Sequence, residues 1–214
     1  MRLGYRKSEE SKLMEKYEVA AFLHAAREIE RDARSYYLFA LMYLLGLRIG
    51  EAIILEWDHV GPTGTDGLPM NIQVPTLKQR QPKPPLISVP VLSHPKLVAQ
   101  AFDRSRQPKA ERRVRSRWLF GGEVPGEHLS KTQAYRLFCL LRDTARLRRD
   151  LTPHAFRHTA ACELKALGAD YTTCKRFLRH TEHDSTEVYM HIKPAQWARF
   201  RGALDLPPLK PLAR

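Results

Sequence analysis

Residues 153–159 read PHAFRHT, a segment that predicts a helix with two basic side chains on one side. A threonine followed by a proline is typical of a helix start. At about 100° per residue, four apolar side chains fall on one face, which predicts the side packed in the core. These are Phe156, Ala160, Leu164 and Leu167. Arg157 lies at the edge of this stripe, and His154 lies about 60° away on the same side.

The position of Arg157 predicts a nearby anion. A half-buried guanidinium needs a negative partner, and a phosphate matches the two parallel donors of its fork. The other interpretation is a structural arginine that is paired with a carboxylate in the core. This segment alone leaves both interpretations open.

A second arginine lies in residues 46–51, which read GLRIGE. Arg48 falls in a tight turn between two apolar segments, so its head cannot easily reach bulk water. Glu51 follows three residues later, where it can support the guanidinium and hold it in place. An internal ion pair at a helix cap explains the pattern equally well. Lys78 lies in a proline-rich hairpin, and by itself it predicts only an exposed loop lysine.

The hydrophobic pattern predicts a mostly helical domain with one small antiparallel sheet, an α+β fold. Helices are expected at 17–30, 35–45 (ending at Gly46), 49–56, 95–106, 130–147, 153–168, 171–179, 184–191 and 194–203. Strands are expected at 71–75 and 86–91, joined by a turn over 78–85. We expect residues 1–16 to form a tail or linker, residues 17–203 the domain, and residues 204–214 a flexible tail.

The charge of the chain predicts a partner with repeating negative charge. Its 36 Lys and Arg exceed its 23 Asp and Glu, and residues 101–214 carry +11 of the net +13. Backbone phosphates of nucleic acid match this excess, while a solvated face or a loop is the other interpretation. The predicted phosphate contacts are Arg112, Arg113, Arg115, Arg117, Arg146, Arg148, Arg149, Lys175, Arg176 and Arg179.

The sequence argues against several other classes of protein. Its longest apolar run, residues 36–47, is too short for a membrane span, which takes about 20 residues. Three scattered cysteines fit reduced thiols in a cytosol. Phosphate-binding glycine loops of nucleotide enzymes are missing. His154 and His158 have the spacing of a zinc helix, but the glutamate of HExxH is missing, so we expect no metal.

Taken together, these motifs resemble the catalytic domain of the tyrosine recombinase (phage integrase) family. The resemblance includes residues 46–51, Lys78 in the hairpin and His154-x-x-Arg157-His158. It also includes Leu178-Arg179-His180 with Tyr189 nine residues later. The order and spacing of the motifs extend over about 17–203. One departure is visible, because the family usually has glycine where Arg179 stands. We expect Arg179 to add a phosphate contact or to alter the local turn.

The resemblance implies strand cleavage through a covalent tyrosine link. Tyr189 would attack the scissile phosphorus and form a 3′-phosphotyrosyl bond. Arg48 and Arg157 would bind the two non-bridging oxygens and stabilise the charge of the transition state. The link conserves the phosphodiester energy, so neither ATP nor another cofactor is implied.

The remaining motif residues have supporting roles in that chemistry. Lys78 would protonate the departing 5′-oxygen, and His154 would accept the tyrosine proton or assist the reverse step. His180 would bond a phosphate oxygen. Glu51 would orient Arg48.

The resemblance also implies binding partners and a cellular location. We expect double-stranded DNA, a homotetramer on DNA and action at the nucleoid in the cytoplasm of a bacterium or archaeon, without a membrane. The amphipathic segment 194–203, with Trp197 and Phe200, would dock on a neighbouring subunit or pack on its own domain. Family members usually carry a further N-terminal DNA-clamping domain. We expect this chain to be a fragment without it, with a naturally minimal enzyme as the alternative.

Two other functions remain open from the sequence. A DNA-binding protein could keep this fold without recombination activity. A topoisomerase IB-like or telomere-resolving enzyme would use the same chemistry with a different outcome.

Overall fold

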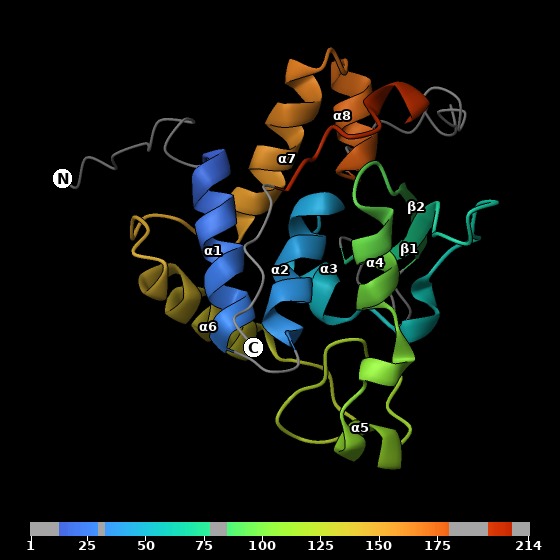
Figure 1. Cartoon of the computed structure of the whole chain (residues 1–214), viewed down its shortest axis with the longest axis vertical. Helices are drawn as coiled ribbons and strands as arrows, with labels where there is room; N and C mark the ends of the chain where they lie inside the picture. Colours follow the sequence, from blue (N-terminus) through green and yellow to red (C-terminus); the bar gives the residue numbers. More distant parts are fainter. Residues whose placement is uncertain (1–12, 30–32, 78–84, 180–196, 207–214) are drawn as a thin grey trace.

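A computed structural model describes residues 13–29, 33–77, 85–179 and 197–206 of the 214-residue chain. Its α helices are α1 (Lys16–Ile29), α2 (Arg34–Leu44), α3 (Ile49–Ile53), α4 (Pro95–Ala101), α5 (Lys109–Arg113), α6 (Lys131–Thr144), α7 (His154–Ala166) and α8 (Tyr171–Phe177). Short 3-10 turns are η2 (Trp57–His59), η3 (Arg104–Arg106) and η4 (Ala198–Phe200). The expected α+β class is confirmed (Figure 1). Among the helices in these ranges, none is long and apolar enough to cross a membrane.

Strands β1 (Asn71–Pro75) and β2 (Leu86–Pro90) form an antiparallel pair in the predicted positions. Ile72 lies opposite Val89, and both side chains are buried. Residues that alternate along a strand point to opposite faces, so one face of this sheet packs on the core. Figure 1 shows the sheet on the side of the molecule that also carries α3 and α4.

Helix α2 lies at the centre of the domain because it is apolar on nearly every side. Its Phe39 ring packs at 5.0 Å from Phe22 of α1 and at 5.9 Å from both Phe138 of α6 and Phe156 of α7. All four rings are almost fully buried. This aromatic cluster joins α1, α2, α6 and α7, and so fixes the direction in which α7 presents its arginine.

Several helix ends differ from the prediction. The expected helix 95–106 breaks at Asp103, whose side chain accepts a hydrogen bond from Ser105 N and starts the separate turn η3. Helix α7 ends at Ala166, so Leu167 lies past the stripe that was predicted for it and is exposed, while Phe156 is buried as expected. The expected helix 184–191 lies outside the described residues.

The packed domain extends beyond both predicted boundaries. Met14 is buried, and its backbone N donates to Thr159 Oγ1 at 2.9 Å, so residues 13–16 belong to the fold and not to a tail. At the other end, Leu204 and Leu206 are buried, so the expected flexible tail does not begin at 204. In both places an apolar side chain that the sequence left outside the domain completes its core.

The C-terminal segment 197–206 packs on its own domain. It forms the short turn η4 in place of the expected helix 194–203. Phe200 is buried, with its ring 6.2 Å from Trp197, and Gly202 N donates to Leu92 O at 2.8 Å. For residues 197–206 the structure shows packing on their own domain, and docking on a neighbouring subunit stays a prediction.

Helix α2 ends in a glycine turn that leads directly into Arg48. Gly46 has a φ of +56°, Gly46 N donates to Tyr43 O, and Leu47 N donates to Met42 O. These two bonds are the Schellman pattern, in which the residue after the helix is left-handed. A Cβ atom at Gly46 would also lie 2.9 Å from the side chains of Phe177 and Leu178.

We predict that Gly46→Ala lowers the free energy of unfolding more than Gly168→Ala does. Gly168 ends α7 in the same type of turn, with a φ of +82°, but nothing lies within 4 Å of the Cβ position. Both variants carry the left-handed strain of about 1–2 kcal/mol, and Gly46→Ala adds overpacking of about 1–3 kcal/mol. Urea unfolding measures both values, and equal losses would contradict the close packing around Gly46.

Candidate functional site

Arg48 and Glu51 form the exposed side of a charged cluster at the start of α3. Arg48 Nη1 donates to Glu51 Oε1 at 2.8 Å, and Arg48 N donates to Glu51 Oε2 at 2.8 Å. Glu51 has no exposed surface, whereas 27% of the Arg48 side chain is exposed. The predicted contact between the two residues is confirmed, and the head of Arg48 reaches solvent more than the sequence indicated.

Arg157 enters the same cluster from α7. Its Nη1 donates to Gly46 O at 2.6 Å, and its Nη2 donates to Leu178 O. Nη1 also lies 3.8 Å from Glu51 Oε2. The sequence predicted a half-buried side chain, but only 2% of it is exposed because the α2–α3 turn and the end of α8 close over it.

Arg179 is the third guanidinium of the cluster and lies fully inside the protein. Its Nη2 donates to Glu51 Oε2 and to Gly46 O, both at 2.8 Å, and its Nη1 donates to Leu45 O at 3.1 Å. The prediction of a phosphate contact is therefore wrong for Arg179 in this structure, because its head is buried and turned towards Glu51. Arg179 has a φ of +55°, the left-handed conformation that favours glycine, so the expected alteration of the local turn stays a prediction.

Among the described residues, the cluster holds more positive than negative charge. Three guanidinium groups of this part of the chain lie around one carboxylate, that of Glu51. Burial, with the charges of Arg179 and Arg48, lowers the pKa of Arg157 to about 9. Burial alone would raise the pKa of Glu51, but the nearby Arg179 charge and the hydrogen bonds hold it below its ordinary value. A buried excess of positive charge favours the binding of an anion.

The other predicted catalytic side chains lie beside the cluster or outside the described residues. His154 is exposed at the first residue of α7, with its ring 4.5 Å from that of His158 and perpendicular to it. Lys78, His180 and Tyr189 lie outside the described residues.

Described neighbours of two of those residues lie against α3 or in the cluster. A Cβ atom at Gly50 of α3 would lie 2.9 Å from Leu77, the residue before Lys78, and 3.0 Å from the Lys131 side chain. Arg179 itself precedes His180. Lys131 is a cationic residue beside Gly50, two residues after Arg48, that the sequence analysis missed. Its position at the start of α6 gives no local signal of contact with α3.

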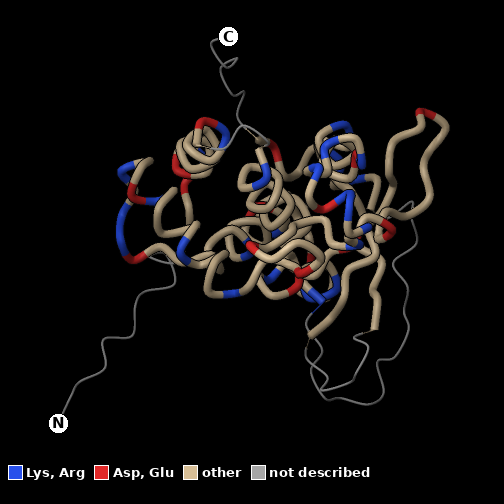
Figure 2. The backbone as a smooth tube through the Cα atoms, turned by 90° about the horizontal axis from the view of Figure 1, so that it is seen from below, with Lys and Arg blue, Asp and Glu red and all other residues tan. Residues whose placement is uncertain are grey.

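The predicted phosphate contacts fall into separate groups along the chain. Arg112, Arg113, Arg115 and Arg117 are exposed on α5 and the turn after it, as are Arg146 and Arg149 after α6. Lys175 and Arg176 of α8 are half-buried. Figure 1 places α5 and α8 at opposite ends of the long axis, and Figure 2 shows acidic positions between the basic ones.

Arg148 differs from the other basic residues after α6. Its Nε donates to Glu18 Oε1 at 3.0 Å, its Nη2 donates to Leu13 O, and its Nη1 lies 3.7 Å from Asp150 Oδ2. The guanidinium ties the segment before α1 to the α6–α7 loop. Its predicted role as a phosphate contact does not fit these bonds, because they hold the head within the fold.

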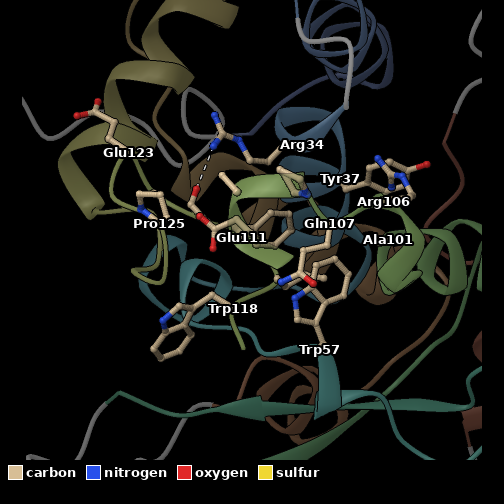
Figure 3. Close-up of a pocket in the computed structure, with 16 residues that line it drawn as sticks. Arg34, Tyr37, Trp57, Ala101, Arg106, Gln107, Glu111, Trp118, Glu123 and Pro125 are labelled. Atoms are coloured by element: carbon tan, nitrogen blue, oxygen red, sulfur yellow. Dashed lines mark hydrogen bonds between the residues drawn. The ribbon is translucent and has the colours of Figure 1, made fainter. Parts of the chain in front are cut away.

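A cavity of about 210 Å³ lies away from the arginine cluster. Figure 3 shows its aromatic residues Tyr37, Trp57 and Trp118, together with Arg34 and Glu111. Arg34 Nη1 donates to Gly121 O at 3.0 Å across one side of it. Arg48, His154 and Arg157, the predicted catalytic residues that the structure describes, do not line this cavity, so we place the candidate chemistry at the cluster around Glu51.

We predict that Glu51→Gln lowers the free energy of unfolding by about 3–5 kcal/mol at pH 7, because it leaves buried cations without their carboxylate. The lowered pKa of Glu51 means that its contribution is present above the ordinary value of 4.5 and disappears as pH falls through the folded value. The difference between wild type and variant should therefore narrow in acid. Urea unfolding across this pH range measures it.

Asp58→Asn is the matched control for this prediction. Asp58 bonds Arg104 at 2.6 Å, but both side chains are mostly exposed. Removing such a surface pair changes the free energy of unfolding by about 1 kcal/mol or less. An equal loss in both variants would show that Glu51 does not neutralise a buried cluster.

Comparison with known proteins supports the resemblance. The chain is 29% identical over 161 residues to tyrosine recombinase XerD of Corynebacterium glutamicum, covering 75% of this chain and 49% of that protein. The integrase from mycobacterium phage Brujita matches 93% of this chain and 60% of that chain, with a TM-score of 0.66 and 18% identity. The XerH recombinase, solved with its difH substrate before cleavage, matches 84% and 50%, with a TM-score of 0.59 and 20% identity.

These matches establish the fold and the family. The chain spans about half the length of the curated relatives that it matches. The model of the phage integrase family matches residues 12–196, which include the whole arginine cluster. The charged site around Glu51 is thus set in the helical framework of these relatives, and the chain belongs to the phage integrase family.

Proposed function

We propose that this chain is the strand-cleaving and rejoining domain of a site-specific DNA recombinase or integrase. The observation that carries the proposal is the cluster in which, among the described residues, Arg48, Arg157 and Arg179 share one carboxylate, that of Glu51. A phosphodiester supplies the missing negative charge, and its non-bridging oxygens match guanidinium donors. Membership of the phage integrase family supports this choice of anion.

We assign the binding of the phosphate to Arg48, which is partly exposed, and to Arg157, which is buried behind it. Arg48 uses one side-chain bond to Glu51 and keeps its other donors on the half-exposed side. Arg157 uses one donor each for Gly46 O and Leu178 O, which fixes its plane and leaves further N–H groups for an oxygen. Donors that are held in place before the substrate arrives stabilise developing charge without reorganisation.

The proposed reaction exchanges one phosphate ester for another. The oxygen of Tyr189 bonds to phosphorus while the bond to the 5′-oxygen of the DNA breaks. Lys78 gives the departing oxygen its proton, and His154 accepts the proton of the tyrosine. His180 donates to a phosphate oxygen. Attack by a 5′-hydroxyl of another strand reverses these steps and rejoins the DNA, so the cycle consumes no ATP.

The proposed partner is double-stranded DNA, held by exposed arginines on α5 and after α6. The relative XerH was solved on its difH substrate, which supports DNA as the ligand of this fold. Recombination joins two duplexes, so a homotetramer on DNA is the proposed assembly. The proposed site of action is the nucleoid of a bacterial or archaeal cell.

We predict that the chain forms an SDS-resistant adduct with a pool of nicked duplexes of random sequence, in EDTA and without ATP. Tyr189→Phe should abolish the adduct because it removes the nucleophile, while Arg48→Ala should slow its formation by about 10²-fold or more. Gel electrophoresis after denaturation measures the amount of adduct, and sequencing the captured DNA identifies the cleaved sequence. Binding without any adduct would favour the DNA-binding alternative, and relaxation of supercoils without site preference would favour the topoisomerase alternative.

We predict that DNA binding by this chain weakens steeply with salt and that the arginines of α5 and the turn after it carry part of this dependence. Changing Arg112, Arg113 and Arg115 together to Gln should make the plot of log association constant against log salt less steep. The negative slope should shrink in magnitude by about 0.9 for each lost phosphate contact. Fluorescence anisotropy across a salt series measures the slope. Lys96→Gln on α4 is the control and should leave it unchanged, whereas an unchanged slope in the triple variant would remove α5 from the interface.

A further inference from the structure

We propose that Arg179 is a positioning residue for the phosphate site. Its buried guanidinium holds Glu51 so that Arg48 is oriented and Arg157 keeps its charge available for the phosphate. This inference rests on the proposed function and adds to it a residue at a position where the family usually has glycine. The case for it comes from the backbone, the contacts and the charges around Arg179.

The backbone at Arg179 is unfavourable for any residue except glycine. It follows the last turn of α8, with Arg179 N donating to Arg176 O at 3.0 Å, and its φ is +55°. A left-handed conformation costs an L-residue about 1–2 kcal/mol. Arg115 and Arg146 share such a φ, but both are exposed in surface turns. At Arg179 the strain accompanies a fully buried side chain, so the side chain must contribute contacts that glycine cannot.

Those contacts connect Arg179 to Arg48 through Glu51. Arg179 Nη2 binds Glu51 Oε2, and Glu51 Oε1 binds Arg48 Nη1, each at 2.8 Å. Arg179 also donates to Leu45 O and Gly46 O, the carbonyls at the end of α2. It therefore holds both the carboxylate that orients Arg48 and the turn that carries Arg48.

The hydrogen bonds of Arg179 are also incomplete for a purely structural arginine. Its buried Nε has no partner among the described residues. Arg142, a buried arginine elsewhere, pairs its Nε with Asp143 Oδ1 at 3.0 Å and its Nη1 with Arg149 O at 2.9 Å. An unpaired buried donor is unfavourable. The contacts of Arg179 are instead concentrated in Nη1 and Nη2, which bind Glu51 and the carbonyls of Leu45, Gly46 and Phe177.

Arg179 and Arg157 compete for the same oxygen of Glu51. Arg179 Nη2 lies 2.8 Å from Glu51 Oε2, whereas Arg157 Nη1 lies 3.8 Å from it. If Arg179 were neutral, Glu51 could turn towards Arg157 and neutralise it. The cluster would then lose the positive charge of Arg179. The new ion pair between Glu51 and Arg157 would also offset part of the charge of Arg157. Both changes weaken the attraction for a phosphate.

Arg179→Met tests the proposal, because methionine fills similar space without charge. The first readout is the rise in melting temperature that inorganic phosphate produces, which needs no DNA. We expect Arg179→Met to retain less than about a third of the wild-type rise. The second is the initial rate of adduct formation on a nicked duplex recovered from the random pool. We expect a fall of about ten- to a hundredfold, with the Kd for that duplex within about threefold of wild type.

Two further variants separate positioning from stability. Arg179→Lys keeps the positive charge but lacks the paired donors of the guanidinium. It should therefore retain part of the phosphate-induced rise in melting temperature and part of the adduct rate. Arg142→Met removes a buried arginine away from the site, and it should lower the melting temperature while leaving the phosphate-induced rise and the adduct rate near wild type. If Arg179→Met does not fold, the phosphate-induced rise in melting temperature and the adduct rate are measured on Arg179→Gly instead. Glycine accepts the left-handed backbone without strain.

Each result has a defined consequence. A wild-type phosphate response and adduct rate in the folded Arg179 variants would overturn the role of Arg179 and leave the proposed function standing. Failure of the wild type to form any adduct would overturn the proposed function instead, and the phosphate response would still decide whether Arg179 organises an anion site. A matching loss in Arg142→Met would also overturn the proposal, because general destabilisation would then explain the effect.

Discussion

The carboxylate of Glu51 is the interaction on which the site depends. It lies without exposed surface at the start of α3 and binds Arg48 and Arg179 directly, with Arg157 close by. These three arginines come from the α2–α3 turn, from α7 and from the end of α8. One buried negative charge therefore joins three segments that are far apart in the sequence. The Phe22–Phe39–Phe138–Phe156 cluster brings the helices together, and Glu51 then sets how their charged ends meet.

The end of α2 shows why this arrangement can form. Leu45 and Gly46 have left the helical hydrogen-bond pattern, so their carbonyls need donors. Arg157 and Arg179 supply them, and cations are favourable at the C-terminus of a helix. Gly46 is needed here because its backbone is left-handed and because Phe177 and Leu178 pack where a side chain would be. The same turn thus positions Arg48, caps α2 and anchors α8.

The local parts of the fold and site could be predicted from the sequence, and the long-range parts could not. The two strands, the end of α2 at Gly46 and the Arg48–Glu51 contact all depend on residues within a few positions of each other. The burial of Arg157 depends on Leu178 at the end of α8, which is 21 residues away in the chain, and no periodicity in the sequence predicts that contact. Arg179 shows the limit most clearly. Its neighbours are basic, so the charge pattern indicated a phosphate contact, but the left-handed turn directs its side chain inward to Glu51.

The charge balance of the cluster explains why such a costly arrangement would persist. Replacing buried ionic groups by packed apolar residues is often neutral or stabilising, so stability gives no reason to bury three arginines around one glutamate. An anion that binds only the folded protein stabilises it by an amount that rises with the logarithm of its concentration relative to its Kd. The lowered pKa of Arg157 reflects the cost of burying its charge beside the other arginines. Among the described residues the cluster therefore keeps an excess of positive charge, and the phosphate of a DNA strand is the partner that we propose for it.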